Sequence, residues 1–276
     1  MEYSYKQVQE NIKENEFQIK KKFGQNFIID KNIINNIING SEIDKETLVV
    51  EIGPGMGALT TELVKKAKNV LCYEIDTTLK PILSKIEASN LEIIYEDFLK
   101  RNVKKDLEKY NCQKIHLVAN LPYYITTPIL IKVLEDQLNI DKIVVMVQKE
   151  VGDRFKAKEG SKDYSSLSIL FNYHYTITKL MDISRNVFIP KPNVDSIVLT
   201  MNKKANKEYI EDIDIFYKLI RDAFKYKRKN IRNNLKDYNL TLIESILKNY
   251  GFDLNSRAEQ LNYKIFIEIS NKLVKE

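Results

Sequence analysis

The chain has 276 residues, 43% of them hydrophobic and 30% charged, which is enough for one large domain, or for a large one and a small one. No apolar run reaches the roughly 20 residues needed to span a bilayer, and the N-terminus lacks the apolar core of a signal peptide. The net charge of +6 permits a polyanionic partner without requiring one. The two cysteines form no Cys-x-x-Cys pair and neither histidine has a partner at metal-ligand spacing. We therefore expect reduced thiols, a cytoplasmic protein, no membrane association and no metal.

Short β-type runs alternate with helical patterns over most of the chain, which is typical of a doubly wound α/β sheet. Asp30 precedes apolar residues at helical spacing and Gly40 follows them, which predicts a capped helix before the first strand. From about Tyr209 onward the apolar period is helical. We expect a Rossmann-like domain over residues 1–205 and a small all-α domain over residues 206–276. The runs that predict a seven-stranded sheet are Thr47–Ile52, Asn69–Ile75, Leu91–Tyr95, Lys114–Ala119, Lys142–Val147, Thr176–Ile183 and Ser196–Met201.

The first of these strands leads into a glycine-rich loop, where the backbone can turn sharply and approach a ligand closely. Gly53, Gly55 and Ala58 satisfy the dinucleotide fingerprint and suit S-adenosylmethionine equally well. Glu74, at the end of the second strand, can accept hydrogen bonds from both hydroxyls of a ribose. Asp97, after the third strand, can accept from an adenine amine, and no His or Lys is placed for hydride transfer. We favour S-adenosylmethionine over a nicotinamide cofactor; a mere tight turn is the alternative.

The fourth strand ends in Asn120-Leu121-Pro122-Tyr123. Methylating the exocyclic amine of an adenine requires the nitrogen lone pair to be localised, which means accepting hydrogen bonds from both N–H groups. The side-chain oxygen of Asn120 can accept one, and the carbonyl of Leu121, extended before Pro122, can accept the other. Tyr123 offers a ring on which a base can stack. An ordinary loop with Pro and Asn as turn residues is the alternative, and the tetrapeptide alone does not separate the two.

Several further motifs follow one another in order. Over essentially its whole length the chain resembles the small-subunit ribosomal RNA adenine dimethyltransferases (the KsgA type). The motifs of the pocket follow the pattern of that family, whereas Ile28 stands where Leu is usual and Ser165 where Gly is usual. Besides the glycine loop and the tetrapeptide, the motifs are Lys22–Ile28, Gln148–Val151 with Gly160–Lys162 nearby, Phe188–Ser196, Arg228–Leu235 and Arg257–Leu261.

The resemblance implies S-adenosylmethionine as the cofactor and assigns roles to single residues. Asn120 would lie between the cofactor and the target amine, and Tyr123 and Phe188 would sandwich the target base. The implied catalytic residues are Asn120, Leu121, Tyr123 and Phe188. The implied cofactor-binding residues are Asn26, Ile28, Gly53, Gly55, Glu74, Asp97 and Asn120.

The resemblance also implies a reaction: dimethylation of two adjacent adenosines in a hairpin loop near the 3′ end of small-subunit (16S) ribosomal RNA, coupled to biogenesis of the small subunit. Its partners would be this RNA and the pre-small ribosomal subunit, and we expect a monomer. The erythromycin-resistance methylases, which modify a large-subunit adenosine, are one alternative; they tend to have Ser at Gly24 and Ile at Leu121. A largely non-catalytic ribosome-assembly factor is another, and the intact tetrapeptide and Glu74 argue against it.

The helical tail carries a basic segment interrupted by the aromatic residues Phe224 and Tyr226. By itself such a segment is typical of a solvated helix face. Beside a methylase domain, contact with RNA phosphates is the better interpretation. The residues expected to bind RNA are Lys225, Lys227, Arg228, Lys229 and Arg232.

Overall fold

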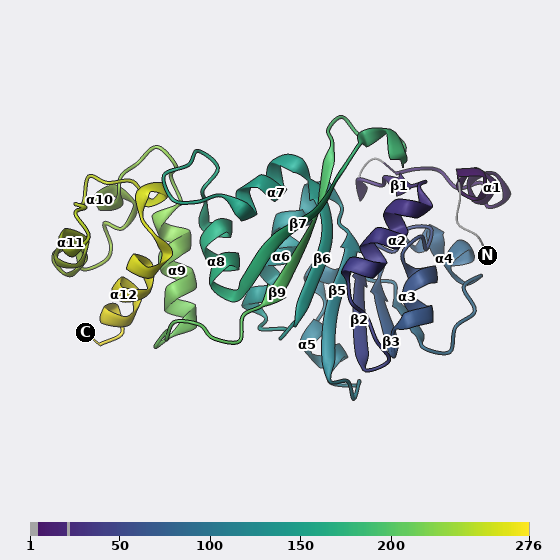
Figure 1. The fold of residues 1–276 in the computed structure, drawn as a ribbon, viewed down its shortest axis with the longest axis horizontal. Helices are drawn as coiled ribbons and strands as arrows, with labels where there is room; N and C mark the ends of the chain where they lie inside the picture. Colours follow the sequence, from purple (N-terminus) through teal and green to yellow (C-terminus); the bar gives the residue numbers. More distant parts are fainter. Residues whose placement is uncertain (1–4, 21–22, 276) are drawn as a thin grey trace. The chain divides into compact units, whose positions relative to one another are not determined.

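The structure, a computed structural model, describes residues 5–20 and 23–275, so Lys22 of the first motif lies outside the described residues. None of the helices within these ranges is long and apolar enough to cross a membrane. The helices in chain order are α1 (Tyr5–Glu14), α2 (Lys31–Gly40), α3 (Thr60–Lys66), α4 (Lys80–Leu83), α5 (Val103–Leu107), α6 (Thr126–Glu135), α7 (Lys149–Lys156), α8 (Ser166–His174), α9 (Ile213–Ala223), α10 (Ile231–Asn234), α11 (Leu240–Asn249) and α12 (Tyr263–Leu273) (Figure 1). The strands are β1 (Phe27–Ile28), β2 (Thr47–Ile52), β3 (Asn69–Tyr73), β4 (Leu91–Ile94), β5 (Lys114–Asn120), β6 (Lys142–Gln148), β7 (Tyr175–Ile183), β8 (Phe188–Ile189) and β9 (Ser196–Lys203).

Seven strands form the central sheet, in the order β4-β3-β2-β5-β6-β9-β7, and the predicted seven-stranded α/β sheet is confirmed. Strands β4, β3, β2, β5 and β6 run parallel, and β9 is antiparallel to β6. Every residue of β2 is buried, as expected for a parallel strand covered on both faces. The chain leaves β2 toward β3 on one side and later returns to β5 on the other. This reversal makes a crevice at the carboxyl ends of β2 and β5, where open α/β sheets bind their ligands.

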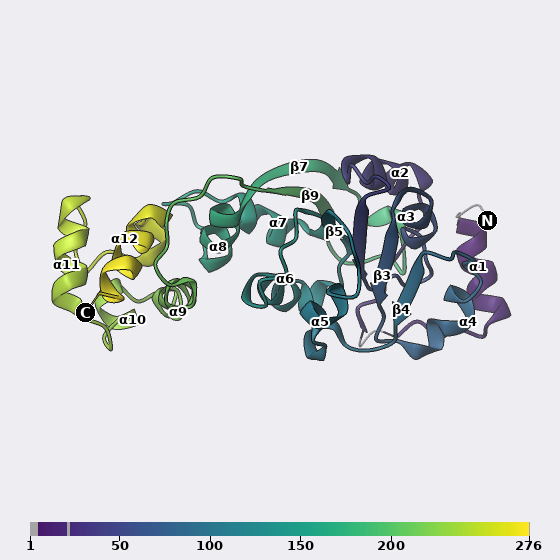
Figure 2. The ribbon, with the colours of Figure 1, turned by 90° about the horizontal axis from the view of Figure 1, so that it is seen from below.

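Helices cover both faces of the sheet: α2 and α3 lie on one side of the strands and α5 and α6 on the other (Figure 2). The α2–α3 side buries Ile34, Ile37 and Leu63 against residues of the strands that include Val49 and Val70. These contacts explain the apolar periodicity of the sequence, because each helix turns one stripe toward the sheet.

The helix predicted before β2 is α2, and Asp30 caps it as expected by accepting from the main-chain N–H of Asn32 at 2.8 Å. Gly40 is the last residue of this helix, whereas we expected it to follow the helix. Glycine is favoured here by packing, because a Cβ at this position would come within 2.6 Å of the side chain of Leu180.

The internal contacts divide the chain into two compact units, Met1–Gly152 with Thr178–Lys203 and Asp153–Ile177 with Lys204–Glu276. This division differs from the expected boundary near residue 205, because Asp153–Ile177 groups with the C-terminal helices. The reason is aromatic packing: Tyr173 of α8 lies against Phe216 of α9, with the ring centroids 5.5 Å apart.

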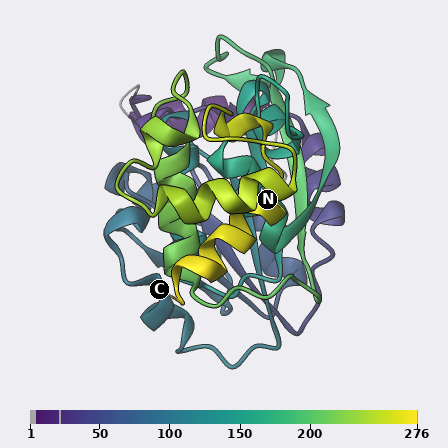
Figure 3. The same cartoon turned by 90° about the vertical axis from the view of Figure 1, so that its left-hand side faces the viewer.

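The second unit is built around α9, an amphipathic helix that buries Phe216, Leu219 and Ile220. Helix α12 packs on both α9 and α11; the three run from green to yellow in Figure 3. Phe224, which follows α9, lies 6.0 Å from Phe266 of α12, measured between ring centroids. The helical period predicted from Tyr209 onward is thus confirmed.

Candidate active site

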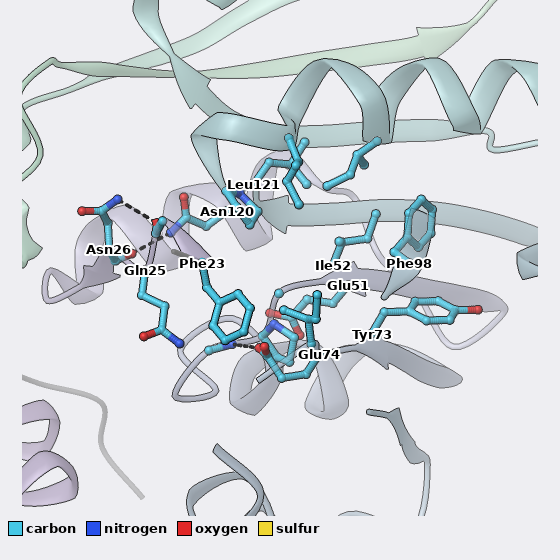
Figure 4. A pocket seen from close by; sticks show the side chains of 18 of the residues that line it. Phe23, Gln25, Asn26, Glu51, Ile52, Tyr73, Glu74, Phe98, Asn120 and Leu121 are labelled. Atoms are coloured by element: carbon cyan, nitrogen blue, oxygen red, sulfur yellow. Dashed lines mark hydrogen bonds between the residues drawn. The ribbon is translucent and has the colours of Figure 1, made fainter. Parts of the chain in front are cut away.

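One cleft opens at the carboxyl ends of the parallel strands of the first unit (Figure 4). It encloses about 950 Å³, counted with the solvent space at its mouth, which is in the range of cofactor sites. Its walls are the segments Phe23–Ile28, Gly53–Gly55, Glu74–Ile75, Glu96–Leu99 and Asn120–Ile125, together with side chains from the neighbouring elements. The structure therefore brings together, on one cleft, nearly all the residues that we expected to bind the cofactor and the target amine.

The glycine loop forms the floor of this cleft. Gly53 and Gly55 have φ values of +71° and +59°, which L-residues adopt only at a cost. A Cβ on Gly53 would project toward Pro122, whose ring atoms lie 3.8 Å from that position, so a side chain there would fill the space between the two loops. Because neither glycine has a side chain, a ligand can lie directly against the main chain of this loop.

Glu74 lies at the end of β3 and is only 5% exposed. Its Oε1 accepts from the main-chain N–H of Asp76 at 2.8 Å and its Oε2 from that of Gly55 at 3.2 Å. A carboxylate has about four acceptor positions, so each oxygen keeps room for one hydroxyl of a ribose. Burial raises the pKa of Glu74 to about 7. The residue fits the ribose role, and its charge near neutral pH depends on what it contacts.

Asp97 lines the cleft after β4. Its Oδ1 accepts from the main-chain N–H of Leu99 at 2.9 Å, which caps a short helical turn. This bond orients the carboxylate and leaves Oδ2 as the atom that can accept from an adenine amine. The arrangement fits the predicted contact with the adenine of the cofactor.

Asn120 ends β5, and its side-chain amide donates to the main-chain oxygen of Asn26 at 3.0 Å. Figure 4 shows the two residues facing each other at the rim of the cleft. Because the Nδ2 atom is engaged, the Oδ1 atom is the end of the amide that can accept from a bound amine. The side chain of Asn26 donates in turn to the carbonyl of Gly24 at 2.9 Å, which fixes the local path of the N-terminal segment.

Leu121 and Tyr123 complete the amine-binding side. Leu121 as a whole is 1% exposed and its main-chain N–H donates to the carbonyl of Met146 at 3.2 Å. The role of its own carbonyl as the second acceptor stays a prediction. The Tyr123 ring lines the cleft, and its hydroxyl lies 2.6 Å from the hydroxyl of Ser196. That bond holds the ring in place.

Phe188 is the one expected catalytic residue that the structure does not place on the cleft wall. Its side chain is 3% exposed and belongs to an apolar cluster with Ile28 and Ile183. It reaches this position because β8 pairs with β1, which sets Ile28 opposite Phe188. The expected sandwich of a base between Tyr123 and Phe188 stays a prediction, and it would require the covered ring of Phe188 to become accessible.

Two residues that we assigned no role, Gln25 and Asp76, hold the N-terminal segment over the cleft. Asp76 accepts from the amide of Gln25 at 2.7 Å and from the ammonium of Lys20 at 2.6 Å. Burial acts to raise the pKa of Asp76, but the bonds from Lys20, Thr78 and Gln25 together keep that pKa below its ordinary value. Gln25 lies within the Lys22–Ile28 motif and Asp76 directly follows the second predicted strand, yet no pattern in either segment indicates that they meet.

Glu51 is another residue that sequence reasoning left without a role. It is 1% exposed at the base of the cleft, where its carboxylate accepts from the hydroxyl of Thr60 at 2.6 Å. Burial raises its pKa to about 7, and the nearby charge of Glu74 adds to that effect. Two buried carboxyl groups thus lie beneath the glycine loop.

The residues expected to bind RNA lie in the second unit, around the turn between α9 and α10. The ammonium of Lys227 donates to the main-chain oxygen of Lys162 at 3.0 Å. The N–H of Gly160 donates to the oxygen of Glu259 at 2.7 Å. The structure therefore brings the Gly160–Lys162 motif against both the basic segment and the Arg257–Leu261 motif. All five residues are exposed.

Comparison with known proteins agrees with this geometry. The family model described as ribosomal RNA adenine dimethylase matches residues 16–275. Ribosomal RNA small subunit methyltransferase A of Staphylococcus aureus (strain JH9) is 44% identical over 264 residues, covering 92% of this chain and 89% of the relative. Two solved structures are similar in fold: a dimethyladenosine transferase from Plasmodium falciparum (TM-score 0.75, 24% identity, 90% and 98% of the two chains) and the 23S rRNA methyltransferase ErmE (TM-score 0.63, 24% identity, 90% and 99%). The family match over nearly the whole chain, with the pocket motifs gathered on one cleft, places this protein in the ribosomal RNA adenine dimethylase family.

Proposed function

We propose that the protein uses S-adenosylmethionine to dimethylate the exocyclic amines of two adjacent adenosines in small-subunit ribosomal RNA. The observation that carries the proposal is the fixed side chain of Asn120. Its amide nitrogen is bonded to Asn26, so its oxygen is the atom of the amide left to accept from a bound amine, and the carbonyl of Leu121 would be the second acceptor. Two acceptors at one point suit an adenine amine, because that group has two N–H donors. Membership in the family and the 44% identity to a small-subunit methyltransferase support the same reaction.

S-adenosylmethionine supplies a methyl group that its positive sulfur has already activated. The residues of the chain hold and orient the partners. Glu74 would hold the ribose of the cofactor and Asp97 its adenine. The glycine loop leaves room for the methionine part. Asn120 and Leu121 would localise the lone pair of the target nitrogen, and Tyr123 would stack on the target base. After one transfer a single N–H remains, so one of the two acceptors is enough for the second.

No strong base is needed in this arrangement, because the alkylated nitrogen is acidic enough to release its proton to water. Consistent with this, the residues nearest the amine site are Asn120, Leu121 and Tyr123. Burial raises the pKa of Tyr123, so its hydroxyl stays neutral at physiological pH and acts only through hydrogen bonding and stacking.

We further propose that the basic segment after α9 contacts phosphates of the RNA. Its five cationic residues lie around one turn, and Lys227 joins that turn to the loop that carries Lys162. On this view the second unit binds the immature small subunit while the first presents the cleft to the target hairpin. The protein would act as a monomer in the cytoplasm.

A second candidate is methylation of a large-subunit adenosine, because the fold of ErmE is also similar. Fold similarity at 24% identity does not choose between the two RNA targets. The higher identity to a small-subunit enzyme and the presence of Gly24 and Leu121 favour the first proposal.

The test is a transfer assay with radiolabelled S-adenosylmethionine and three substrates: unmethylated small subunits, free small-subunit RNA and large-subunit RNA. We expect label in small-subunit RNA, recovered as dimethyladenosine after digestion. Label confined to large-subunit RNA would establish the second candidate instead. An Asn120→Ala variant that still binds small subunits but transfers no methyl would separate catalysis from a role in assembly alone.

A further inference from the structure

Tyr226 is an aromatic side chain held at the surface of the second unit. It is 51% exposed, although it lies only two residues after Phe224, which packs toward Phe266. The ammonium groups of Lys225 and Lys229 lie 5.6 and 5.1 Å from the centroid of its ring. Both ammonium groups lie over the ring, whose quadrupole attracts them. A base that stacks on the ring would displace them toward the phosphates on either side of its nucleotide.

The turn that carries this ring is fixed by one side chain. The amide of Asn234 donates to the carbonyl of Ala223 at 2.7 Å, and its longer bonds reach the carbonyls of Tyr226 at 3.3 Å and Lys229 at 3.4 Å. The N–H of Lys229 also donates to the carbonyl of Tyr226 at 2.9 Å. A ligand that meets a preformed turn does not have to order it, so binding costs less conformational entropy.

The charge around the ring selects a polyanion. The segment from Arg221 to Arg232 holds six cationic residues, namely Arg221, Lys225, Lys227, Arg228, Lys229 and Arg232, against the single acid Asp222. The carboxylate of Asp222 is itself engaged by Lys218 at 3.0 Å and by Tyr238 at 2.6 Å. With six cationic residues against one acid, the segment keeps an excess of positive charge around Tyr226.

We propose that Tyr226 is a stacking platform for one unpaired base of ribosomal RNA, with Lys225 and Lys229 contacting the phosphates on either side of that nucleotide. The inference rests on the proposed RNA-binding role of the basic segment and gives it a defined nucleotide site. That site lies in the second unit, so it is distinct from the cleft that would hold the target adenosine. Single-stranded RNA is the partner that combines phosphates with exposed base faces.

The chain contains no tryptophan, which allows a direct optical test. Tyr226→Trp would keep an aromatic platform and introduce the only indole in the protein. Tyr209→Trp is the matched control, because Tyr209 is 71% exposed and precedes the same helix that Tyr226 follows. Titration with unmethylated small-subunit RNA should quench the fluorescence of Trp at position 226 and shield it from acrylamide, and leave that of Trp at position 209 unchanged.

Affinity measurements separate stacking from charge. Tyr226→Ala should bind the same RNA about 5-fold to 150-fold more weakly, the range found when one stacked base loses its platform. Tyr226→Phe should bind as the wild type does. The slope of log K against log salt should stay unchanged in Tyr226→Ala, since no cation is removed, and should fall in Lys225→Gln with Lys229→Gln. A merely structural role for Tyr226 would lower the melting temperature of Tyr226→Ala.

The failures of the two ideas are distinguishable. If neutralising the lysines leaves RNA binding unchanged, the proposed RNA-binding segment is wrong and the platform falls with it. If the lysine variants weaken binding but Tyr226→Ala does not, only the platform is wrong. If Tyr226→Ala weakens binding to assembled small subunits but not to protein-free RNA, the ring contacts a ribosomal protein and the base-stacking proposal is overturned.

Discussion

The side-chain amide of Asn120 donates to the main-chain carbonyl of Asn26, and the two residues are 94 positions apart in the chain. The bond joins the loop after β5 to the N-terminal segment and fixes which end of the Asn120 amide faces the cleft. An acid of nearly the same shape cannot make this bond, because it has no N–H to donate at neutral pH.

We therefore expect both Asn120→Asp and Asn120→Ala to lower the rate of methyl transfer by a factor on the order of 10² to 10³, the effect typical of removing one preorganised hydrogen bond at a reacting centre. The assay is single-turnover transfer from radiolabelled S-adenosylmethionine to small-subunit RNA. Melting temperatures should stay near that of the wild type. Transfer by Asn120→Asp at more than a tenth of the wild-type rate would show that the orientation of the amide is unimportant.

Cofactor affinity should depend on pH through Glu74. The pKa of this residue is raised to about 7 by burial, and accepting two ribose hydroxyls favours the ionised form. Affinity should therefore be full at pH 8 and fall as pH drops through 7, to about tenfold weaker at pH 6. Isothermal titration calorimetry with S-adenosylmethionine measures the trend and the proton released on binding.

The control is Glu74→Gln, which should bind weakly and with little pH dependence between pH 6 and 8. Glu51 also has a pKa of about 7, so Glu51→Gln should be tested in parallel and should keep the wild-type trend. A trend that survives in Glu74→Gln but disappears in Glu51→Gln would transfer the effect to the deeper carboxylate.

We expect Gln25 to strengthen cofactor binding, although it is not among the residues predicted to contact the cofactor. Its amide bonds to Asp76, whose side chain is 1% exposed, and in its absence Lys20 alone would hold the N-terminal segment to that carboxylate. Removing a bond to a buried charged group costs roughly 1–3 kcal/mol, so Gln25→Ala should weaken cofactor binding about tenfold. The surface pair Lys85–Glu14 provides the control: Lys85→Ala should change nothing measurable.

Gly152 gives a stability prediction whose sign runs against helix propensity. Alanine is the better helix former by about 1 kcal/mol, yet a Cβ at Gly152 would lie 2.3 Å from the Cγ2 methyl of Ile197. Overpacking of this kind typically costs about 1–3 kcal/mol, so Gly152→Ala should lower the free energy of unfolding. Chemical denaturation would measure the change. In the double variant with Ile197→Ala the two effects should be clearly less than additive, because the clash is gone.

Removing charge from the basic turn should weaken the binding of RNA but not the binding of the cofactor. Neutralising Lys225, Arg228 and Lys229 to Gln should lower the slope of log K against log salt by roughly 0.7–0.9 for each phosphate that is no longer neutralised. The affinity for S-adenosylmethionine should stay unchanged. The matched control, Lys248→Gln with Lys272→Gln and Lys275→Gln, removes the same charge from other positions of the same unit. Equal effects in both variants would mean that only net charge matters.

The elements that were predictable from sequence are those whose pattern repeats along the chain. Strand β2 was predicted with its observed bounds, because a fully buried parallel strand is a mostly apolar run and glycine ends this one. Motifs likewise predicted which residues would line the cleft, from Asn26 to Asn120. The interactions that were not predictable join one element to another. Nothing in the segment around Gln25 indicates Asp76 as its partner, and nothing around Phe188 indicates that β1 would cover it.

The difference in the domain boundary has the same origin. Asp153–Ile177 continues the local pattern of helices seen earlier in the chain, so its membership in the second unit depends on packing such as that of Tyr173 on Phe216. Side-chain packing of this kind follows from three-dimensional proximity and leaves no period in the sequence.

The pairing of β1 with β8 has a consequence for synthesis of the protein. The glycine loop, Glu74, Asp97 and Asn120 all leave the ribosome before Phe188, the residue that stands opposite Ile28. A nascent chain that ends at β6 therefore carries most of the predicted cofactor-binding residues. Its strand β1, however, still lacks its partner strand β8. The ability to bind the cofactor should therefore arise late in translation, when β8 emerges and can pair with β1.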